Sequence, residues 1–471
     1  MDTKALRQKI LDLAIHGKLV PQDPNDEPAS VLLERIKAEK ERLIKEGKIK
    51  RSKKSAKSSD TPHYENVPFE VPSSWVWCRL EDIAYVASGS TPDKTCFVEN
   101  GVPYIKMYNL RNQKIDFAYH PQYITEEVHN GKLQRSRTEV GDLIMNIVGP
   151  PLGKLAIIPT TLPQANFNQA AVLIRPYKFK EVLVSYLKVY LEEMSEINSI
   201  ATRGSAGQVN ISLTQSQNMR IPIPPLNEVR RIIEEVSKYD ILIDSLKQNI
   251  TDIQNLIAYT KSKILDLAIH GKLVPQDPND EPAIELLKRI NPDFTPCDNG
   301  HSRKLPQGWA YCQLSNVLKI TMGQSPKGDS LNNKRGIEFH QGKICFSDKF
   351  LLESGIFTNE PTKIAEPNSI LLCVRAPVGV VNITKNQICI GRGLCALTPF
   401  EGNVDFYFYL LQTLQDSFDN QSTGTTFKAI SGEIIRNENI ILPPLAEQQR
   451  IVQKIEELFH VFDNIQNALE V

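Results

Sequence analysis

The sequence has few of the residues that build metal or disulfide frameworks. Its 471 residues include only 8 cysteines and 8 histidines, and no two cysteines form a Cys-x-x-Cys pair. The histidines show no paired spacing with them, so no zinc site is expected. Cys78 and Cys312 occupy equivalent places in two Trp-x-x-Cys strings. We therefore predict reduced core thiols in a cytoplasmic protein.

Long hydrophobic runs and an excess charge are also missing. No run reaches the roughly 18 apolar residues of a membrane span, and the N-terminus has no apolar signal core. We expect no membrane partner. The 55 basic and 55 acidic residues cancel, which counts mildly against a pure nucleic-acid binder, although acidic helices can offset basic faces elsewhere. The length exceeds that of one core, so two to four domains are expected.

Catalytic motifs are absent as well. A methyltransferase loop would need Asn/Asp-Pro-Pro-Tyr/Phe, and the nearest string, at 146–151, has the wrong spacing and no following aromatic residue. The string from Gly336 to Lys343 is one residue too long for a phosphate-binding loop. Pro92-Asp93 is not followed by the second acid of a nuclease site. No Gly-x-Ser-x-Gly nucleophile turn occurs. These absences favour recognition over catalysis.

An internal repeat organises the chain. Residues 10–29, ILDLAIHGKLVPQDPNDEPA, recur identically at 264–283, 254 residues further on. The spacing of apolar residues over 4–16 predicts a helix that ends at Gly17, and three prolines make the following segment a loop. Two copies at this distance indicate tandem duplication rather than a solenoid.

Two homologous α+β domains are predicted at 66–225 and 301–444. Pro72, Trp75, Cys78, Leu80 and Gly89 match Pro306, Trp309, Cys312, Leu314 and Gly323. Each domain continues with a strand (102–107 or 337–342), a buried strand, a helix (182–194 or 404–417) and a Gly/Ser/Thr turn. The two domains share this frame but differ sharply in their polar residues.

Helices connect these domains. Apolar residues alternate at spacings of 4 and 3 in the central helical region (226–300) and in the C-terminal helix (445–471), which predicts coiled-coil packing. The N-terminal segment (1–65) matches the end of the central helix, and the C-terminal helix matches its start. The two ends of the chain would thus complete a second long helix. We predict a pseudo-cyclic, pseudo-two-fold architecture in which an antiparallel pair of long coiled-coil helices separates the domains.

A basic run follows a second helix predicted from Ser30. Residues 35–57 contain 11 Lys or Arg and 3 Glu. Its end lacks apolar periodicity and is expected to be a linker. A solvated tether and a non-specific phosphate contact are both consistent with this composition.

Polar loop residues form the candidate binding set. Arg, Lys, Asn and Gln reach base edges in the DNA major groove, while Ser, Thr and turn amides hold phosphates. In the first domain the candidates are Lys106, Asn109, Arg111, Lys154, Asn168, Gln169, Arg203, Ser205 and Gln208. In the second they are Lys327, Arg335, Gln341, Lys343, Arg375, Arg392, Thr425, Thr426 and Lys428. The two Gly/Ser/Thr turns are favoured because each carries a cation at a matching place.

The sequence resembles the specificity subunits of type I restriction–modification systems. The resemblance rests on both copies of KILDLAIHGKLVPQDPNDEPA, on the Pro-x-x-Trp domain openings, and on the exits IPPLNEVRRI (223–232) and LPPLAEQQRI (442–451). The second exit matches the family's Pro-Pro-Leu-x-Glu-Gln. The first departs from it at Val229, where Gln is usual.

This resemblance implies a non-catalytic subunit that binds double-stranded DNA. Each target-recognition domain would read half of a bipartite, asymmetric site, and the long helices would set the gap between the halves. The helices would also dock two modification subunits that methylate adenine, and restriction subunits would join that core. S-adenosylmethionine, ATP and Mg would bind those partners and not this chain. The alternative is a non-catalytic scaffold whose duplicated domains bind proteins.

Overall fold

The structure is a computed structural model that describes residues 2–51, 67–149, 152–201, 210–296, 305–423 and 428–470. The chain divides into two compact units, an N-terminal unit (residues 2–249) and a C-terminal unit (residues 250–471). One helix, α7 (Leu226–Ile269), contributes its first part to the N-terminal unit and its second part to the C-terminal unit. In the part of the chain that the structure describes, no helix is long and apolar enough to cross a membrane.

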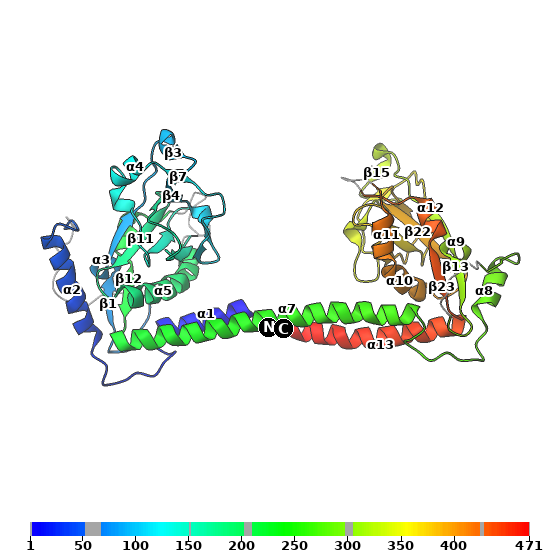
Figure 1. Cartoon of the computed structure of the whole chain (residues 1–471), viewed down its shortest axis with the longest axis horizontal. Helices are drawn as coiled ribbons and strands as arrows, with labels where there is room; N and C mark the ends of the chain where they lie inside the picture. The colour runs from blue at the N-terminus through cyan, green and yellow to red at the C-terminus, as the bar shows by residue number, and fades with distance from the viewer. Residues whose placement is uncertain are drawn as a thin grey trace. The chain divides into compact units, whose positions relative to one another are not determined.

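The N-terminal unit combines helices with short strands (Figure 1). Before α7 its α-helices are α1 (Thr3–Ile15), α2 (Ala29–Lys45), α3 (Leu80–Ile83), α4 (Glu126–Asn130), α5 (Lys180–Ala201) and α6 (Leu213–Gln217). Its strands are β1 (Val76–Arg79), β2 (Ala84–Ser88), β3 (Phe97–Val98), β4 (Val102–Ile105), β5 (Leu110–Arg111), β6 (Lys114–Ile115), β7 (Tyr123–Ile124), β8 (Leu143–Asn146), β9 (Leu155–Ile157), β10 (Asn166–Phe167), β11 (Ala171–Pro176) and β12 (Arg220–Ile223).

The C-terminal unit repeats much of this order. Its further helices are α8 (Ala283–Ile290), α9 (Leu314–Val317), α10 (Val404–Thr413), α11 (Gln415–Gln421), α12 (Gly432–Asn437) and α13 (Leu445–Glu470). Its strands are β13 (Ala310–Gln313), β14 (Leu318–Met322), β15 (Leu331–Asn332), β16 (Ile337–His340), β17 (Phe357–Thr358), β18 (Ile364–Ala365), β19 (Ile370–Cys373), β20 (Val381–Ile383), β21 (Ile388–Ile390), β22 (Leu394–Pro399) and β23 (Asn439–Leu442).

Two sheets of the N-terminal unit reappear in the C-terminal unit with the same strand order. The antiparallel order β2-β11-β8-β9 reappears as β14-β22-β19-β20, and the pair β1-β12 as β13-β23. A parallel pair, β10 with β4 or β21 with β16, occurs once in each unit. The register matches too, because Cys78 pairs with Ile221 and Cys312 with Ile440. The predicted α+β class and the duplication are therefore confirmed.

In the N-terminal unit α1 lies against α5 and the first part of α7 (Figure 1). Arg7 on α1 donates to Glu192 on α5 at 2.6 Å and to Asp240 on α7 at 2.9 Å. Ile10, Ile232 and Val236 are buried in one core with the sheet β2-β11-β8-β9. The stripe of apolar residues read from the sequence thus packs on a domain core as well as on a helix.

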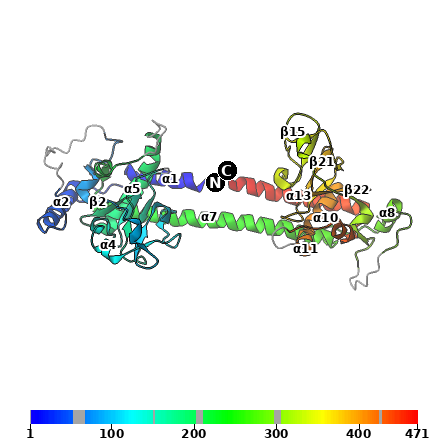
Figure 2. The same ribbon diagram turned by 90° about the horizontal axis from the view of Figure 1, so that it is seen from above.

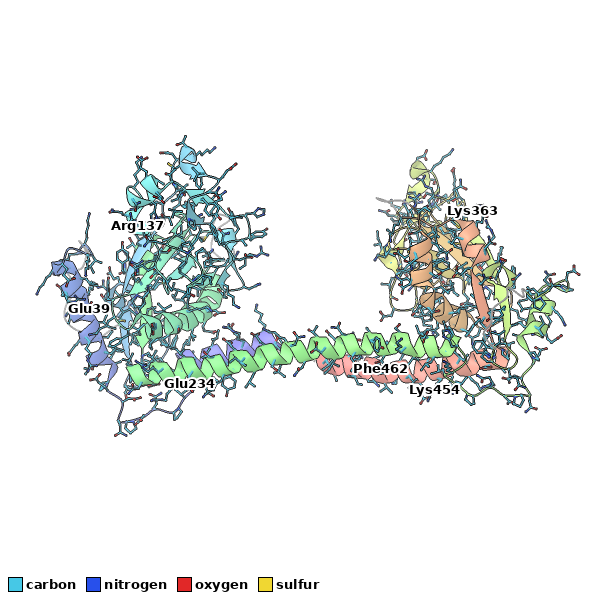
Figure 3. All side chains as sticks on the ribbon, in the orientation of Figure 1. Glu39, Arg137, Glu234, Lys363, Lys454 and Phe462 are labelled. Atoms are coloured by element: carbon cyan, nitrogen blue, oxygen red, sulfur yellow. The ribbon has the colours of Figure 1, made fainter. Side chains whose placement is uncertain are left out.

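In the C-terminal unit α13 runs beside the second part of α7, in the opposite direction (Figure 1 and Figure 2). Lys261 donates to Asp463 at 2.6 Å and its ammonium lies 5.1 Å from the ring centre of Phe459. Phe462, labelled in Figure 3, packs against the core that contains Ile451 and Ile455. This arrangement is the counterpart of α1 on the first part of α7.

Each repeat loop is held to the helix that leaves its domain by the same buried contact. Gln22 donates to Glu228 at 2.5 Å, and Gln276 donates to Glu447 at 3.1 Å. Burial raises the pKa of both carboxyl groups. Next to them Arg231 pairs with Asp26, and Arg450 pairs with Asp280, each at 2.6 Å. The repeat motif and the exit motif therefore occur together because they form one joint.

The end of each repeat helix explains the domain opening. Gly17 and Gly271 have φ of +65° and +62°, as a left-handed residue that ends a helix requires. A Cβ atom would lie 2.5 Å from Pro72 at Gly17 and 2.6 Å from Pro306 at Gly271. The Pro-x-x-Trp opening consequently packs directly on this glycine, which confirms the predicted helix end.

Four predictions differ from the structure in detail. The strands predicted at 102–107 and 337–342 end at Ile105 and His340, because each chain then folds into a short turn. The helix predicted over 404–417 breaks at Leu414, and the break lets Phe418 enter the core. The heptad stripe is only partly covered, since Tyr239 and Ile253 on α7 remain exposed. Cys96 and Cys345 are only half-buried, unlike Cys78 and Cys312.

Candidate functional site

In the second domain a cavity of about 150 Å³ lies where β16 and β19 end. We call it the β16–β19 cavity, and its lining residues are Gln341, Gly342, Lys343, Cys373, Arg375, Ala376 and Gly393. Gln341 and Lys343 follow β16, Arg375 follows β19, and Gly393 belongs to the turn between β21 and β22. Three predicted site residues from two segments thus come together, and two of them carry a positive charge.

A glycine at the end of β14 brings that turn into place. The amide of Gly323 donates to the carbonyl of Leu394 at 2.9 Å. A Cβ atom at Gly323 would lie 2.1 Å from the carbonyl oxygen of Gly391. Gly89 stands in the same relation to Asn168 in the first domain, also at 2.1 Å. Only glycine permits this approach, so both domains position their β10–β11 or β21–β22 turn in the same way.

The other predicted residues of the second domain are less concentrated. Arg392 is exposed on the β21–β22 turn, and its amide donates to Ser325 Oγ at 3.4 Å. Lys327 and Arg335 are exposed on the loops before and after β15. The carbonyl of Lys428 accepts from the Ala376 amide at 3.2 Å, which places this segment beside Arg375. Its ammonium pairs with Asp419 at 2.7 Å.

In the first domain a hollow of about 400 Å³ is lined by two cationic residues, Arg111 and Lys154. We call it the hairpin hollow, and its lining residues are Leu110, Arg111, Asn112, Gln113 and Lys154. The hairpin β5–β6 supplies the first four, while Lys154 comes from the connection between β8 and β9. Lys154 corresponds in position to the β19–β20 connection that carries Arg375. The turn Lys343–Cys345 of the second domain corresponds to the turn Met107–Asn109, which directly precedes this hairpin in the first domain.

Asn109 has a different role from the predicted one. Its side chain is buried, accepts from the Lys106 amide at 2.9 Å and donates to the carbonyl oxygens of Asp116 and Tyr119 at 3.2 and 2.7 Å. These contacts use both amide hydrogens and one acceptor position of Asn109 inside the loop. We correct the prediction accordingly: Asn109 shapes the segment that carries Arg111 and does not present its amide to a ligand.

Two aromatic contacts hold predicted cations of the first domain. The Arg111 guanidinium stacks 4.0 Å from the ring centre of Tyr119 and lies 3.5 Å from Asp116. The Lys106 ammonium lies 5.5 Å from the ring centre of Phe97.

Asn168 and Gln169 occupy the β10–β11 turn, where Gln169 is exposed and the Asn168 side-chain oxygen is buried without a partner in the described structure. Tyr119 was missed from the sequence because nothing in its spacing distinguishes it from a core residue.

The favoured Gly/Ser/Thr turns fall largely outside the described residues. Arg203, Ser205 and Gln208 of the first turn, and Thr425 and Thr426 of the second, lie in segments that the structure does not describe. Of these two turns only Lys428 among the candidates is described. Within the described ranges there is also no group of three His, Cys, Asp or Glu side chains that could hold a metal ion.

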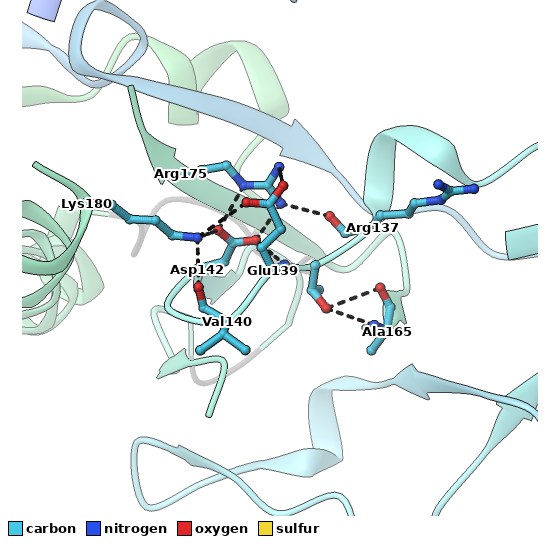
Figure 4. Close-up of polar contacts among 8 residues, drawn as sticks. Arg137, Glu139, Val140, Asp142, Ala165, Arg175 and Lys180 are labelled. Carbon is cyan, nitrogen blue, oxygen red and sulfur yellow. Dashed lines mark hydrogen bonds and ion pairs between the residues drawn. The ribbon is translucent and has the colours of Figure 1, made fainter. Parts of the chain in front are cut away.

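A second polar cluster of the first domain is structural (Figure 4). Asp142 is fully buried and pairs with Arg175 at 2.6 Å and with Lys180 at 2.7 Å. Arg175 also donates to the carbonyl of Arg137 at 3.1 Å. The charged groups of this cluster pair with one another. We therefore interpret the cluster as a stabilising contact of the sheet and not as a binding site.

The duplicated fold, with the β16–β19 cavity in one domain and the hairpin hollow in the other, is typical of a protein with two recognition domains. Residues 72–255 and 306–471 each match the family model of the type I restriction modification DNA specificity domain. These two matches cover more than half of the chain, which therefore belongs to this family.

Related proteins and a solved structure agree with this family. The EcoAI and EcoEI type I restriction enzyme specificity subunits of Escherichia coli are both 28% identical to this chain; each alignment covers 99% of it, and 90% and 91% of the relatives. A chain solved in a study of complex assembly and conformational transition of the type I R-M system is 26% identical. It covers 86% of this chain and 94% of its own length, with a TM-score of 0.58.

Proposed function

We propose that this chain reads a bipartite, asymmetric double-stranded DNA site, with one recognition domain (66–225 or 301–444) for each half. The observation that carries this proposal is the duplicated sheet edge. The same edge carries Gln341, Lys343 and Arg375 in one domain but Arg111 and Lys154 in the other. Two domains with the same sheets but different polar side chains at this edge are suited to bind two different DNA sequences.

In the second domain Arg375 is the proposed base-reading residue and Lys343 the proposed phosphate contact. A guanidinium offers a planar fork that matches the major-groove edge of guanine, whereas an ammonium is a point charge. Gln341 suits adenine in the same way. Arg392, next to the lining residue Gly393, and the exposed Lys327 and Arg335 are further proposed contacts.

In the first domain Arg111 and Lys154 have the corresponding roles. The stack of Arg111 on Tyr119 fixes the guanidinium plane before binding, which lowers the entropy lost when it meets a base. Gln113 Oε1 accepts from the Leu155 amide at 2.8 Å, so the hairpin is fixed to β9. Lys106 and Gln169 are further proposed contacts. Arg203, Ser205, Gln208, Thr425 and Thr426 remain proposed from the sequence alone.

The helices are the proposed docking surfaces for two modification subunits. Large apolar side chains are exposed on helices of both units. On the N-terminal unit they are Leu6, Tyr239, Ile241 and Leu242; on the C-terminal unit they are Ile253, Leu256, Tyr259, Leu267, Val461 and Ile465. Val461 on α13 follows Leu242 on α7 by 219 residues, the offset that relates Pro443 to Pro224. The duplication thus supports two similar docking sites.

The chemistry is proposed to reside in the partners. S-adenosylmethionine would bind the modification subunits that methylate adenine, while ATP and Mg would bind the restriction subunits. The chain itself is proposed to be a non-catalytic, cytoplasmic subunit without a cofactor.

The experiment that tests this function is the methylome of cells that express the chain with its cognate modification subunit. We expect one bipartite motif, with two short half-sites around a fixed gap and a methylated adenine on each strand. Exchange of residues 301–444 for the corresponding domain of a relative should change one half-site only. An assembled complex that yields no new methylated motif would overturn the proposal and favour a protein-binding scaffold.

A further inference from the structure

One apolar side chain stands out beside the β16–β19 cavity. Ile344 is 97% exposed, far more than any other large hydrophobic residue among those that the structure describes. The next most exposed in the same domain, Leu352, is 59% exposed. Ile344 lies between Lys343, which lines the cavity, and Cys345, which is half-buried. A ligand that covers this side chain would gain the free energy of burying its apolar surface.

The turn that carries Ile344 is anchored on both sides. The Phe346 amide donates to the Lys343 carbonyl at 2.9 Å, and the Leu352 amide donates to the Cys345 carbonyl at 2.8 Å. The buried Asn382 donates to the Ser347 carbonyl at 2.7 Å. Phe346 packs against the small core formed with Leu371 and Ile390. Ile344 is therefore presented from a fixed turn, and its β-branched side chain has few rotamers to lose on binding.

The neighbours of Ile344 indicate what would cover it. Lys343 and Arg375 offer the donors that match guanine N7 and O6, and Gln341 matches adenine. These atoms face the major groove, where thymine displays its 5-methyl group. An apolar contact to that methyl group is one way to distinguish thymine from cytosine.

We propose that Ile344 is a specificity-determining residue that reads the 5-methyl group of a thymine in the half-site of the second domain. This inference rests on the proposed DNA-reading function and deepens it. The half-site would contain an A·T pair beside the base pair read by Arg375. In the first domain the corresponding turn (Met107–Asn109) has the half-buried Tyr108 at its middle, so that half-site would be read without this contact.

A base-step wedge is the other use of an exposed isoleucine on DNA. Wedges enter from the minor groove and kink the duplex. The donor set around Ile344 suits major-groove edges instead, which favours the methyl contact.

The test uses the complete complex with its modification subunit and the bipartite site identified by the methylome. Each thymine of the second half-site is replaced singly by deoxyuridine, which lacks only the methyl group. We expect one position at which the wild-type complex loses roughly three- to tenfold in affinity, the scale of one buried methyl group. Ile344→Ala should lose a similar factor on thymine DNA and nothing more on deoxyuridine DNA at that position.

Leu352→Ala is the matched control, because it removes another exposed apolar side chain from the same domain. It should keep the full deoxyuridine effect. Ile344→Ala with undiminished deoxyuridine sensitivity at every position would overturn the proposal. So would unstacking of a 2-aminopurine reporter that depends on Ile344, since that result identifies a wedge. A complex that methylates no bipartite site would instead contradict the proposed function itself.

Discussion

Asp142 and Arg175 face each other across the pair β8–β11, with an oxygen–nitrogen distance of 2.6 Å and the carboxylate fully buried. Their counterparts are Ser369, directly before β19, and Thr398 on β22, whose hydroxyl groups are 2.7 Å apart. The same place in the same sheet thus holds an ion pair in one domain and a neutral hydrogen bond in the other. Each pair satisfies its own buried groups.

Asp142→Ala should destabilise the first domain by roughly 3 kcal/mol, because Arg175 and Lys180 would lose the carboxylate that compensates their charge. The double variant Asp142→Ser, Arg175→Thr, which copies the second domain, should cost much less. Urea unfolding combined with hydrogen exchange of β8 and β11 measures both effects. Equal losses in the two variants would show that the charge compensation matters little.

Gly323→Ala should disturb the β21–β22 turn, since its Cβ would meet the carbonyl oxygen of Gly391 at 2.1 Å. We expect a loss of about 1–3 kcal/mol in stability and weakened binding to the second half-site. Gly328→Ala is the control, because no atom lies within 4 Å of its Cβ position. DNA binding and hydrogen exchange of residues 388–399 are the measurements, and equal behaviour of the two variants would contradict the close approach.

The second domain should lose stability in mild acid through His340. Burial lowers the pKa of His340 although Glu338 lies 3.2 Å away and favours the charged form. The unfolded chain, with an ordinary histidine pKa of about 6.5, then binds more protons than the folded chain. The contribution is therefore complete above about pH 6.5 and declines below it, by at most about 1.4 kcal/mol per pH unit.

His340→Ile tests this origin, because the matching residue of the first domain is Ile105. Urea unfolding from pH 8 to pH 5, read by hydrogen exchange of β16, should show a weaker acid destabilisation in the variant. Identical pH profiles for variant and wild type would assign the effect to other groups.

Removal of Lys343 or Arg375 should separate affinity from specificity. Lys343→Ala should weaken binding to all sequences and reduce the slope of log K against log salt by about 1. Arg375→Ala should cost roughly 1–3 kcal/mol on the cognate half-site and relax one base position. Lys363→Ala, an exposed lysine of the same domain outside the cavity lining (Figure 3), serves as control. A salt slope that neither cavity variant changes would argue against these contacts.

Leu242→Glu and Val461→Glu should each remove one modification subunit from the assembly. Both side chains are about half exposed, at 57% and 51%, and a buried carboxylate without a partner is costly in an interface. Native mass spectrometry should find one modification subunit per chain in either variant and none in the double variant. The control is Gln254→Glu, an exposed polar residue of α7. Unchanged stoichiometry would place the docking surface elsewhere.

The shared frame of the two halves could be predicted because it repeats in the sequence. Gly17, Trp75 and Glu447 each have an identical counterpart within a repeated motif, and such a repeat indicates a common structural role. The burial of Asn109 could not be predicted, because an asparagine that supports a loop has the same neighbours in sequence as one that contacts a ligand. The exposure of Ile344 was hidden for a similar reason, since an apolar residue after a strand is usually part of the core.

The cluster of Gln341, Lys343 and Arg375 required the three-dimensional structure. Residue type and loop position identified each member, but the pairing of β16 with β21 and of β19 with β22 is needed to bring their segments to one cavity. The break at Leu414 likewise depends on tertiary packing, because the local sequence favours a continuous helix.

The joints Gln22–Glu228 and Gln276–Glu447 have a consequence for how such a protein can acquire a new target. Each domain meets its flanking helix through the same side chains, and the 20-residue stretch that supplies the glutamine is identical in both places. A foreign domain that ends in these motifs could form the same contacts with the helices at either position. Recombination between two genes, or between the two copies within one gene, could then replace one half-site of the DNA target in one step. The contacts between domain and helix would stay unchanged.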